Sequence, residues 1–221
     1  MRTTKIAVSV ATVLAGLAGT VSPAAAEPAE PALAVSDLTV LGGGTRDARG
    51  NTVGRDVCGP RGTVLPRHAL GDGSSAYYAH GDALGAGLDP DRAVTTDLWC
   101  TFSLTVTAAQ GRAYNLTNLW MAGQSRLAAG TSGTATTSVS SPSGHTNLTT
   151  TISGPTTLGE NWQLNGLPSD RALIGGCGTA ETLVVTQRMH LPRESNGYLS
   201  NVADPGWNST RLMLSSVPCN D

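Results

Sequence analysis

The sequence predicts an all-β fold, a single-domain antiparallel β-sandwich stapled by two disulfides. Three observations predict it: runs of alternating apolar and polar residues, turn-forming glycine, proline and Asx clusters about every 10 to 20 residues, and four well-separated cysteines. The 221 residues include one phenylalanine, four tryptophans and four tyrosines, so the core must consist mainly of Val, Leu, Ile and Ala. No stretch has convincing helical periodicity.

The N-terminus has the pattern of a secretory signal peptide. A basic start precedes an apolar run from Ile6 to about Val21 and a small-residue site at Ala24 to Ala26. We therefore expect residues 1–26 to be a cleaved signal peptide, residues 27–35 a disordered lead-in and residues 36–221 the β-sandwich domain. The apolar run is short for a bilayer and contains Thr and Gly, and no later segment is apolar enough, so no membrane span is expected.

Charge argues against two classes of partner. The whole chain has a net charge of −2, and removal of residues 1–26 takes away Arg2 and Lys5 but no acidic residue. A mildly acidic surface without a basic cluster argues against nucleic acid and anionic membranes. The remaining chain has arginine but no lysine, which is typical of a bacterium with GC-rich DNA.

Alternation predicts individual strands. Asp37 to Leu41 is expected to be a first strand, and Leu98 to Thr107 is the clearest one. Within the latter, Cys100 lies on the apolar face, whereas Trp99 lies away from that face. Later strands are expected over Leu183–Leu191 and Thr210–Val217.

Residues 132–153 are predicted to form a hairpin with its turn at Ser141-Pro142-Ser143-Gly144. One face should carry Ala135, Thr137 and Val139 from the first arm and Leu148, Thr150 and Ile152 from the second. The opposite face is almost wholly hydroxyl: Thr134, Thr136, Ser138, Ser140, Thr149, Thr151 and Ser153.

The cysteines predict structural disulfides. Four cysteines allow three pairings, and we favour Cys58–Cys100 and Cys177–Cys219 because both pairs are separated by 42 positions. A metal or redox site needs close spacing such as C-x-x-C, which the sequence lacks.

Several short segments, taken in their order and spacing, carry a family resemblance. They are Cys58-Gly59-Pro60-Arg61-Gly62-Thr63-Val64, Tyr78-Ala79-His80-Gly81, Cys100, Gly123, Leu127-Ala128-Ala129-Gly130, Gly133-Thr134, Gly154-Pro155, Trp162 and Cys177-Gly178. On these residues the chain from about Leu38 to Cys219 resembles the secreted family catalogued as domain of unknown function 4360. The resemblance implies a secreted β-sandwich and carries over no catalytic residues.

The sequence contains no recognisable catalytic or metal motif. There is no G-x-S-x-G, and His68, His80, His145 and His190 are scattered without H-E-x-x-H. The only concentration of carboxylates is Asp82, Asp89, Asp91 and Asp97, which we interpret as a solvated loop, with calcium binding as the alternative. We therefore expect no catalytic residue, no metal and no cofactor.

Aromatic residues are the candidates for ligand binding. Trp99, Trp162 and Trp207 are candidate stacking residues, because a flat aromatic face suits a sugar ring; core packing is the alternative for each. The leading hypothesis is a secreted, non-catalytic extracellular binding domain for polysaccharide or a cell-surface component. The alternatives are an envelope-associated structural or protein-interaction domain and a secreted hydrolase with a carboxylate pair.

Overall fold

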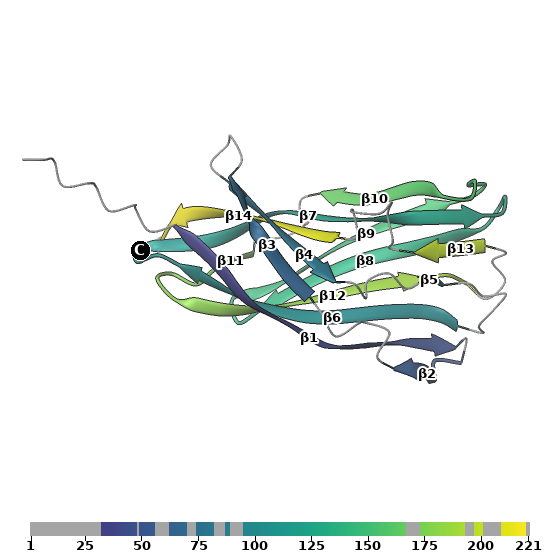
Figure 1. The fold of residues 1–221 in the computed structure, drawn as a ribbon, viewed down its shortest axis with the longest axis horizontal. Coiled ribbons are helices and arrows are strands. Elements are labelled where there is room, and N and C mark those ends of the chain that lie inside the picture. The colour runs from purple at the N-terminus through teal and green to yellow at the C-terminus, as the bar shows by residue number, and fades with distance from the viewer. Residues whose placement is uncertain are drawn as a thin grey trace, which may run out of the picture. The chain divides into compact units, whose positions relative to one another are not determined.

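The fold is all-β, as the sequence predicts. In a computed structural model the described residues are 32–47, 49–55, 62–69, 74–81, 87–88, 95–166, 173–192, 197–200 and 209–219. Every helix or strand assigned within these ranges is a strand, and all the strand pairings given are antiparallel (Figure 1). No helix in this part of the chain is therefore long and apolar enough to cross a bilayer.

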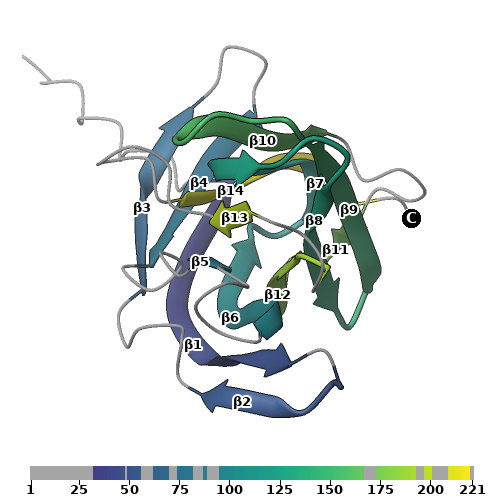
Figure 2. The same cartoon turned by 90° about the vertical axis from the view of Figure 1, so that its right-hand side faces the viewer.

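One sheet has six strands. Its order is β2 (Thr52–Arg55), β1 (Leu33–Asp47), β6 (Thr95–Ala108), β12 (Ala180–His190), β8 (Ser132–Ser141) and β9 (Gly144–Ser153). The succession of β1, β6 and β12 can be followed in Figure 2.

The second sheet is organised by β7 (Arg112–Leu127). Its order is β3 (Gly62–Ala69), β4 (Ser74–Gly81), β14 (Ser209–Pro218), β7, β13 (Gly197–Ser200) and β5 (Gly87–Leu88), and β10 (Glu160–Gly166) and β11 (Leu173–Gly175) also pair with β7. At 16 residues, β7 is long enough to pair with four other strands.

The core lies between inward-facing residues of both sheets. On β6 the alternate residues from Leu98 to Val106 are buried, which confirms the predicted alternation. Phe102 and Leu104 from β6 share one hydrophobic cluster with Tyr114 and Leu116 from β7, so the two sheets bury apolar surface against each other. A second cluster continues this core and combines Leu98 with Met121 and Trp162.

The predicted hairpin is confirmed residue by residue. β8 and β9 pair from Ser132↔Ser153 to Ser141↔Gly144, without a register shift. Ala135, Thr137 and Val139 are buried, whereas the hydroxyl residues between them are partly exposed, so the predicted faces are the observed ones.

One expectation needs correction, one disulfide is confirmed, and several predicted residues lie outside the described part of the chain. β1 begins at Leu33, so residues 33–35 are strand rather than disordered lead-in, because they pair with Ala108, Thr107 and Val106 of β6. The disulfide Cys177–Cys219 is present, with 5.7 Å between the Cα atoms. Cys100 is also disulfide-bonded, and Cys58, residues 1–31, Asp82, Asp89, Asp91 and Trp207 lie outside the described residues.

Candidate binding face around Trp99

Trp99 lies on the outer face of the six-stranded sheet. Its neighbours Leu98 and Cys100 point into the core, so the alternation of β6 directs the indole outward, where it is half-buried. Its register partners are Gly44 on β1 and Arg188 on β12. Because Gly44 has no side chain, the ring meets no side chain at this position of β1. The guanidinium of Arg46 lies over the indole, 4.8 Å from the ring centroid.

Beside Trp99, the carboxylate of Asp97 lies beneath the more exposed side chains of Arg188 and His190. Asp97 Oδ1 accepts hydrogen bonds from Arg188 Nε at 2.9 Å and Nη2 at 2.6 Å, and it lies 3.2 Å from His190 Nδ1. The Asp97 side chain is 11% exposed, against 53% for Arg188 and 43% for His190. The charge that solvent meets here is therefore that of the guanidinium.

Hydroxyl groups continue this face across the sheet. The register places Thr136 beside Arg188 and Thr149 beside Thr136, so Trp99, Arg188 and the two threonines form one row. The Thr136 and Thr149 hydroxyls are 2.9 Å apart, and those of Thr101 and Thr186 in the next row are 3.1 Å apart. Each hydroxyl can donate one hydrogen bond and accept two, so these threonines can also hydrogen-bond to a ligand that carries hydroxyl groups.

Trp162 is a core residue and presents no face to a ligand. It is 7% exposed and belongs to the cluster with Met121 and Leu98. Its indole N–H points at two backbone oxygens, of Ser200 at 3.0 Å and Gln124 at 3.2 Å. The expectation of ligand stacking at Trp162 is therefore corrected: a buried indole needs a hydrogen-bond partner, and here the backbone supplies it.

The other sheet carries a second half-buried tryptophan on its outer face. Trp120 on β7 has Arg211 of β14 and Asn165 of β10 as register partners. The Arg211 guanidinium lies 5.1 Å from the indole centroid. The two sheets thus each place an arginine over an outward-facing tryptophan.

At the start of β12, one carboxylate accepts hydrogen bonds from several donors. Glu181 accepts hydrogen bonds from Tyr114 Oη at 2.8 Å, from Ser143 Oγ at 2.7 and 2.9 Å, and from the Gly176 backbone N–H at 2.9 Å. Burial, together with the hydrogen bond to Glu181, raises the pKa of Tyr114 far above its usual value near 10. These groups stabilise one another through a shared set of hydrogen bonds to Glu181.

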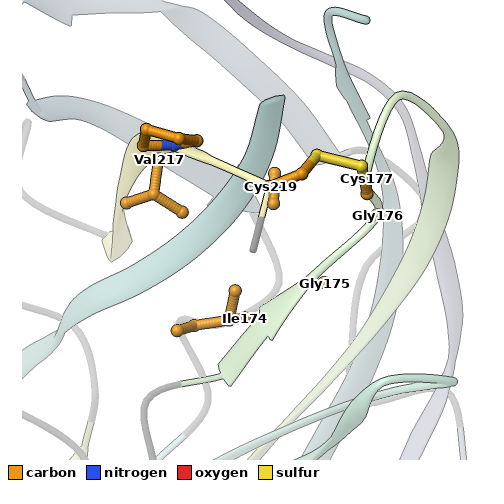
Figure 3. A pocket seen from close by; sticks show the side chains of 8 residues that line it. Ile174, Gly175, Gly176, Cys177, Val217 and Cys219 are labelled. Atoms are coloured by element: carbon orange, nitrogen blue, oxygen red, sulfur yellow. A yellow bond between two sulfur atoms is a disulfide. The ribbon is translucent and has the colours of Figure 1, made fainter. Parts of the chain in front are cut away.

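A shallow cavity of about 530 Å³ lies at the Cys177–Cys219 disulfide (Figure 3). Ala113 and Pro218 line it together with the residues labelled in Figure 3, Ile174, Gly175, Gly176, Cys177, Val217 and Cys219. None of these residues has an ionisable side chain, so the cavity offers apolar surface and no catalytic group.

The described residues contain no group of side chains that could hold a metal ion. No group of three His, Cys, Asp or Glu side chains comes together among them. Asp97, the one described member of the predicted acidic loop, lies in β6 and is paired with Arg188, so its charge is already compensated. His190 faces Asp97, and His145 is exposed on β9.

Sequence reasoning missed the cationic group next to Trp99. Arg46, Arg188 and His190 come from strands far apart in the chain, and only the pairing of β1 and β12 with β6 brings them together. The available signal was local: Arg188 and His190 alternate with the apolar Met189, which places both on the outer face of a strand.

Comparison with known proteins gives one family and a distant structural likeness. The model of the family described as Domain of unknown function (DUF4360) matches residues 72–219. No curated protein matches the chain. Among solved structures, "Structure of TmCBM61 in complex with beta-1,4-galactotriose" is similar at 9% sequence identity and a TM-score of 0.23, over 72% of this chain and 88% of that one.

Proposed function

The chain belongs to the family described as Domain of unknown function (DUF4360), and for this member we propose a secreted, non-catalytic extracellular domain that binds polysaccharide through the face around Trp99. Cleavage of residues 1–26, a bacterial origin, a β-sandwich architecture and a Cys58–Cys100 disulfide are parts of the proposal. The clusters shared by both sheets support the sandwich, and the bonded state of Cys100 supports the second disulfide. Disulfides persist in oxidising compartments, which supports export.

The observation that carries the proposal is the outward indole within a polar face. A sugar ring has an apolar side that stacks on an aromatic ring and hydroxyls that need donors and acceptors at its rim. Trp99 supplies the ring, and Arg188, Thr136 and Thr149 follow it across the sheet in one register row. An exposed cation–π contact is worth only about 0.5–1 kcal/mol, so a sugar can displace Arg46 from the indole at small cost.

The alternatives have less support. The carboxylates Asp97 and Glu181 are each held by hydrogen bonds to neighbouring donors, so neither forms the facing pair that a hydrolase of this kind uses. A protein-interaction domain would favour a continuous apolar patch. The exposed large apolar side chains among the described residues, Leu41, Leu158 and Ile174, lie on three separate segments: β1, the β9–β10 connection and β11.

The test compares two tryptophan variants. Binding of the wild-type chain, Trp99→Ala and Trp120→Ala to xylan, galactan, polygalacturonate, chitin and peptidoglycan is measured by pull-down and isothermal titration calorimetry. Loss of one stacking contact of about 1 kcal/mol should weaken binding about fivefold in Trp99→Ala. Trp120→Ala is the matched control, since Trp120 is also half-buried beneath an arginine, but on the other sheet, and it should bind like the wild type. Unchanged binding by Trp99→Ala, or no binding of any glycan by the wild type, would overturn the proposal.

A further inference from the structure

We infer that the ligand is an acidic polysaccharide, one whose sugars carry carboxylate groups. The inference rests on the proposed function and names the substrate class of the same face. What carries it is the placement of guanidinium groups on both sides of Trp99, on the strands that flank β6. On the β1 side Arg46 lies over the ring, and on the β12 side Arg188 is the direct register partner.

The exposed part of this face is cationic although the chain as a whole is acidic. The chain has a net charge of −2, and the nearby carboxylate, Asp97, has a side chain only 11% exposed. Arg188 lies above it with 53% of its side chain exposed, and Arg46 is also exposed. A ligand that reaches Trp99 therefore meets positive groups first, and the compensating negative charge lies beneath them.

Arg188 is held in place by the same carboxylate. Nε and Nη2 both donate to Asp97 Oδ1, which fixes the plane of the guanidinium. An arginine has five N–H donors, so donors beyond these two remain at its exposed edge. A pre-positioned guanidinium binds a carboxylate in a planar, two-bond geometry and loses little side-chain entropy in doing so.

His190 lies at the same end of the face, 3.2 Å from Asp97 Oδ1. It is the register partner of Asp97 on β12, and its ring is 43% exposed. Arg46, the partner of Asp97 on β1, lies at the same level of the sheet. Two guanidinium groups, of Arg46 and Arg188, thus flank one half-buried tryptophan, which suits a sugar that carries its own anionic group.

The test uses one polysaccharide backbone with and without charge. Affinity for polygalacturonate and for its fully methyl-esterified form is measured by calorimetry with the oxidised full-length protein. We expect the acid form to bind at least about fivefold more tightly, the ratio that corresponds to one exposed ion pair of about 1 kcal/mol. The ratio should shrink when ionic strength is raised to about 0.5 M, because exposed charges are then screened.

Variants show whether the ratio comes from this face. Arg46→Gln should lower the acid-to-ester ratio, and Arg46→Glu should lower it further. Arg126→Gln is the matched control, since Arg126 is an exposed arginine on β7 of the other sheet, and it should leave the ratio unchanged. Thermal unfolding of each variant establishes that it is folded before its ratio is compared.

The outcomes separate this inference from the proposed function. Equal, Trp99-dependent binding of acid and ester overturns the acidic class and leaves polysaccharide binding in place. Binding of no polysaccharide overturns the proposed function itself. A single-stranded DNA oligonucleotide bound as tightly as polygalacturonate also overturns the inference, because the face would then recognise negative charge without the sugar.

Discussion

Replacement of Tyr114 by phenylalanine should destabilise the protein near neutral pH and have almost no effect at pH 11. Tyr114 is 0% exposed, and its hydroxyl donates to Glu181 at 2.8 Å. A hydrogen bond to a charged group contributes about 1.5–3 kcal/mol. Because Ser143 and the Gly176 N–H continue to hold Glu181, we expect a loss at the lower end, about 1.5 kcal/mol at pH 8.

The pH dependence follows from the raised pKa of Tyr114. Burial keeps the folded phenol neutral, whereas in the unfolded chain it ionises near its usual pKa of 10. A group whose folded pKa is raised contributes its full stability below the unfolded pKa and loses it as pH rises, by about 1.4 kcal/mol for each pH unit above 10. At pH 11, ionisation of Tyr114 in the unfolded chain has thus cost the wild type about as much stability as the variant loses by lacking the hydrogen bond. The two free energies of unfolding should therefore converge.

Urea unfolding of the oxidised protein, followed by fluorescence at pH 8 and pH 11, measures this convergence. Ser143→Ala is the control, because it removes a donor to Glu181 without removing a group that titrates, so its cost should be the same at both pH values. A Tyr114→Phe cost that is equal at pH 8 and pH 11 would refute the reasoning.

Two further predictions concern stability. Gly154→Ala should lower the free energy of unfolding by about 2 kcal/mol and the melting temperature by about 4–8 °C, because a Cβ there would lie 2.1 Å from the backbone oxygen of Ala128. An unchanged melting temperature would contradict this prediction. The double variant Cys177→Ala, Cys219→Ala should lose about 4 kcal/mol in guanidinium unfolding, since the disulfide closes a separation of 42 positions, and a loss under about 1 kcal/mol would count against the loop-entropy account.

Where the sequence alternates without interruption, it predicts both the strand and its faces. β6 and the β8–β9 hairpin are of this kind, and the position of Trp99 follows from β6. Trp162 also obeys the alternation of buried and exposed residues, although no strand was predicted for its segment. In β10, Trp162 and Leu164 alternate with Asn161, Gln163 and Asn165, a pattern that places the tryptophan on the buried face.

The longest strand was not predicted because its alternation breaks. In β7 the register with β14 shifts between Met213 and Leu214, and three consecutive residues, Met121, Ala122 and Gly123, are buried. A bulge moves later side chains to the opposite face, so a period of two does not run through the segment. The cationic group at Trp99 was missed for another reason: it depends on which strands are neighbours, and pairing between distant segments is a tertiary property.

The two tryptophans that lie under arginine side chains give the protein an intrinsic fluorescence signal. Arg46 over Trp99 and Arg211 over Trp120 should attract iodide and repel caesium, so these two fluorophores will be quenched by the anion in preference to the cation. Trp162, enclosed in the core, is shielded from both quenchers. A glycan seated on Trp99 would expel iodide from that ring and not from Trp120, so occupancy can be followed by emission in an unlabelled sample.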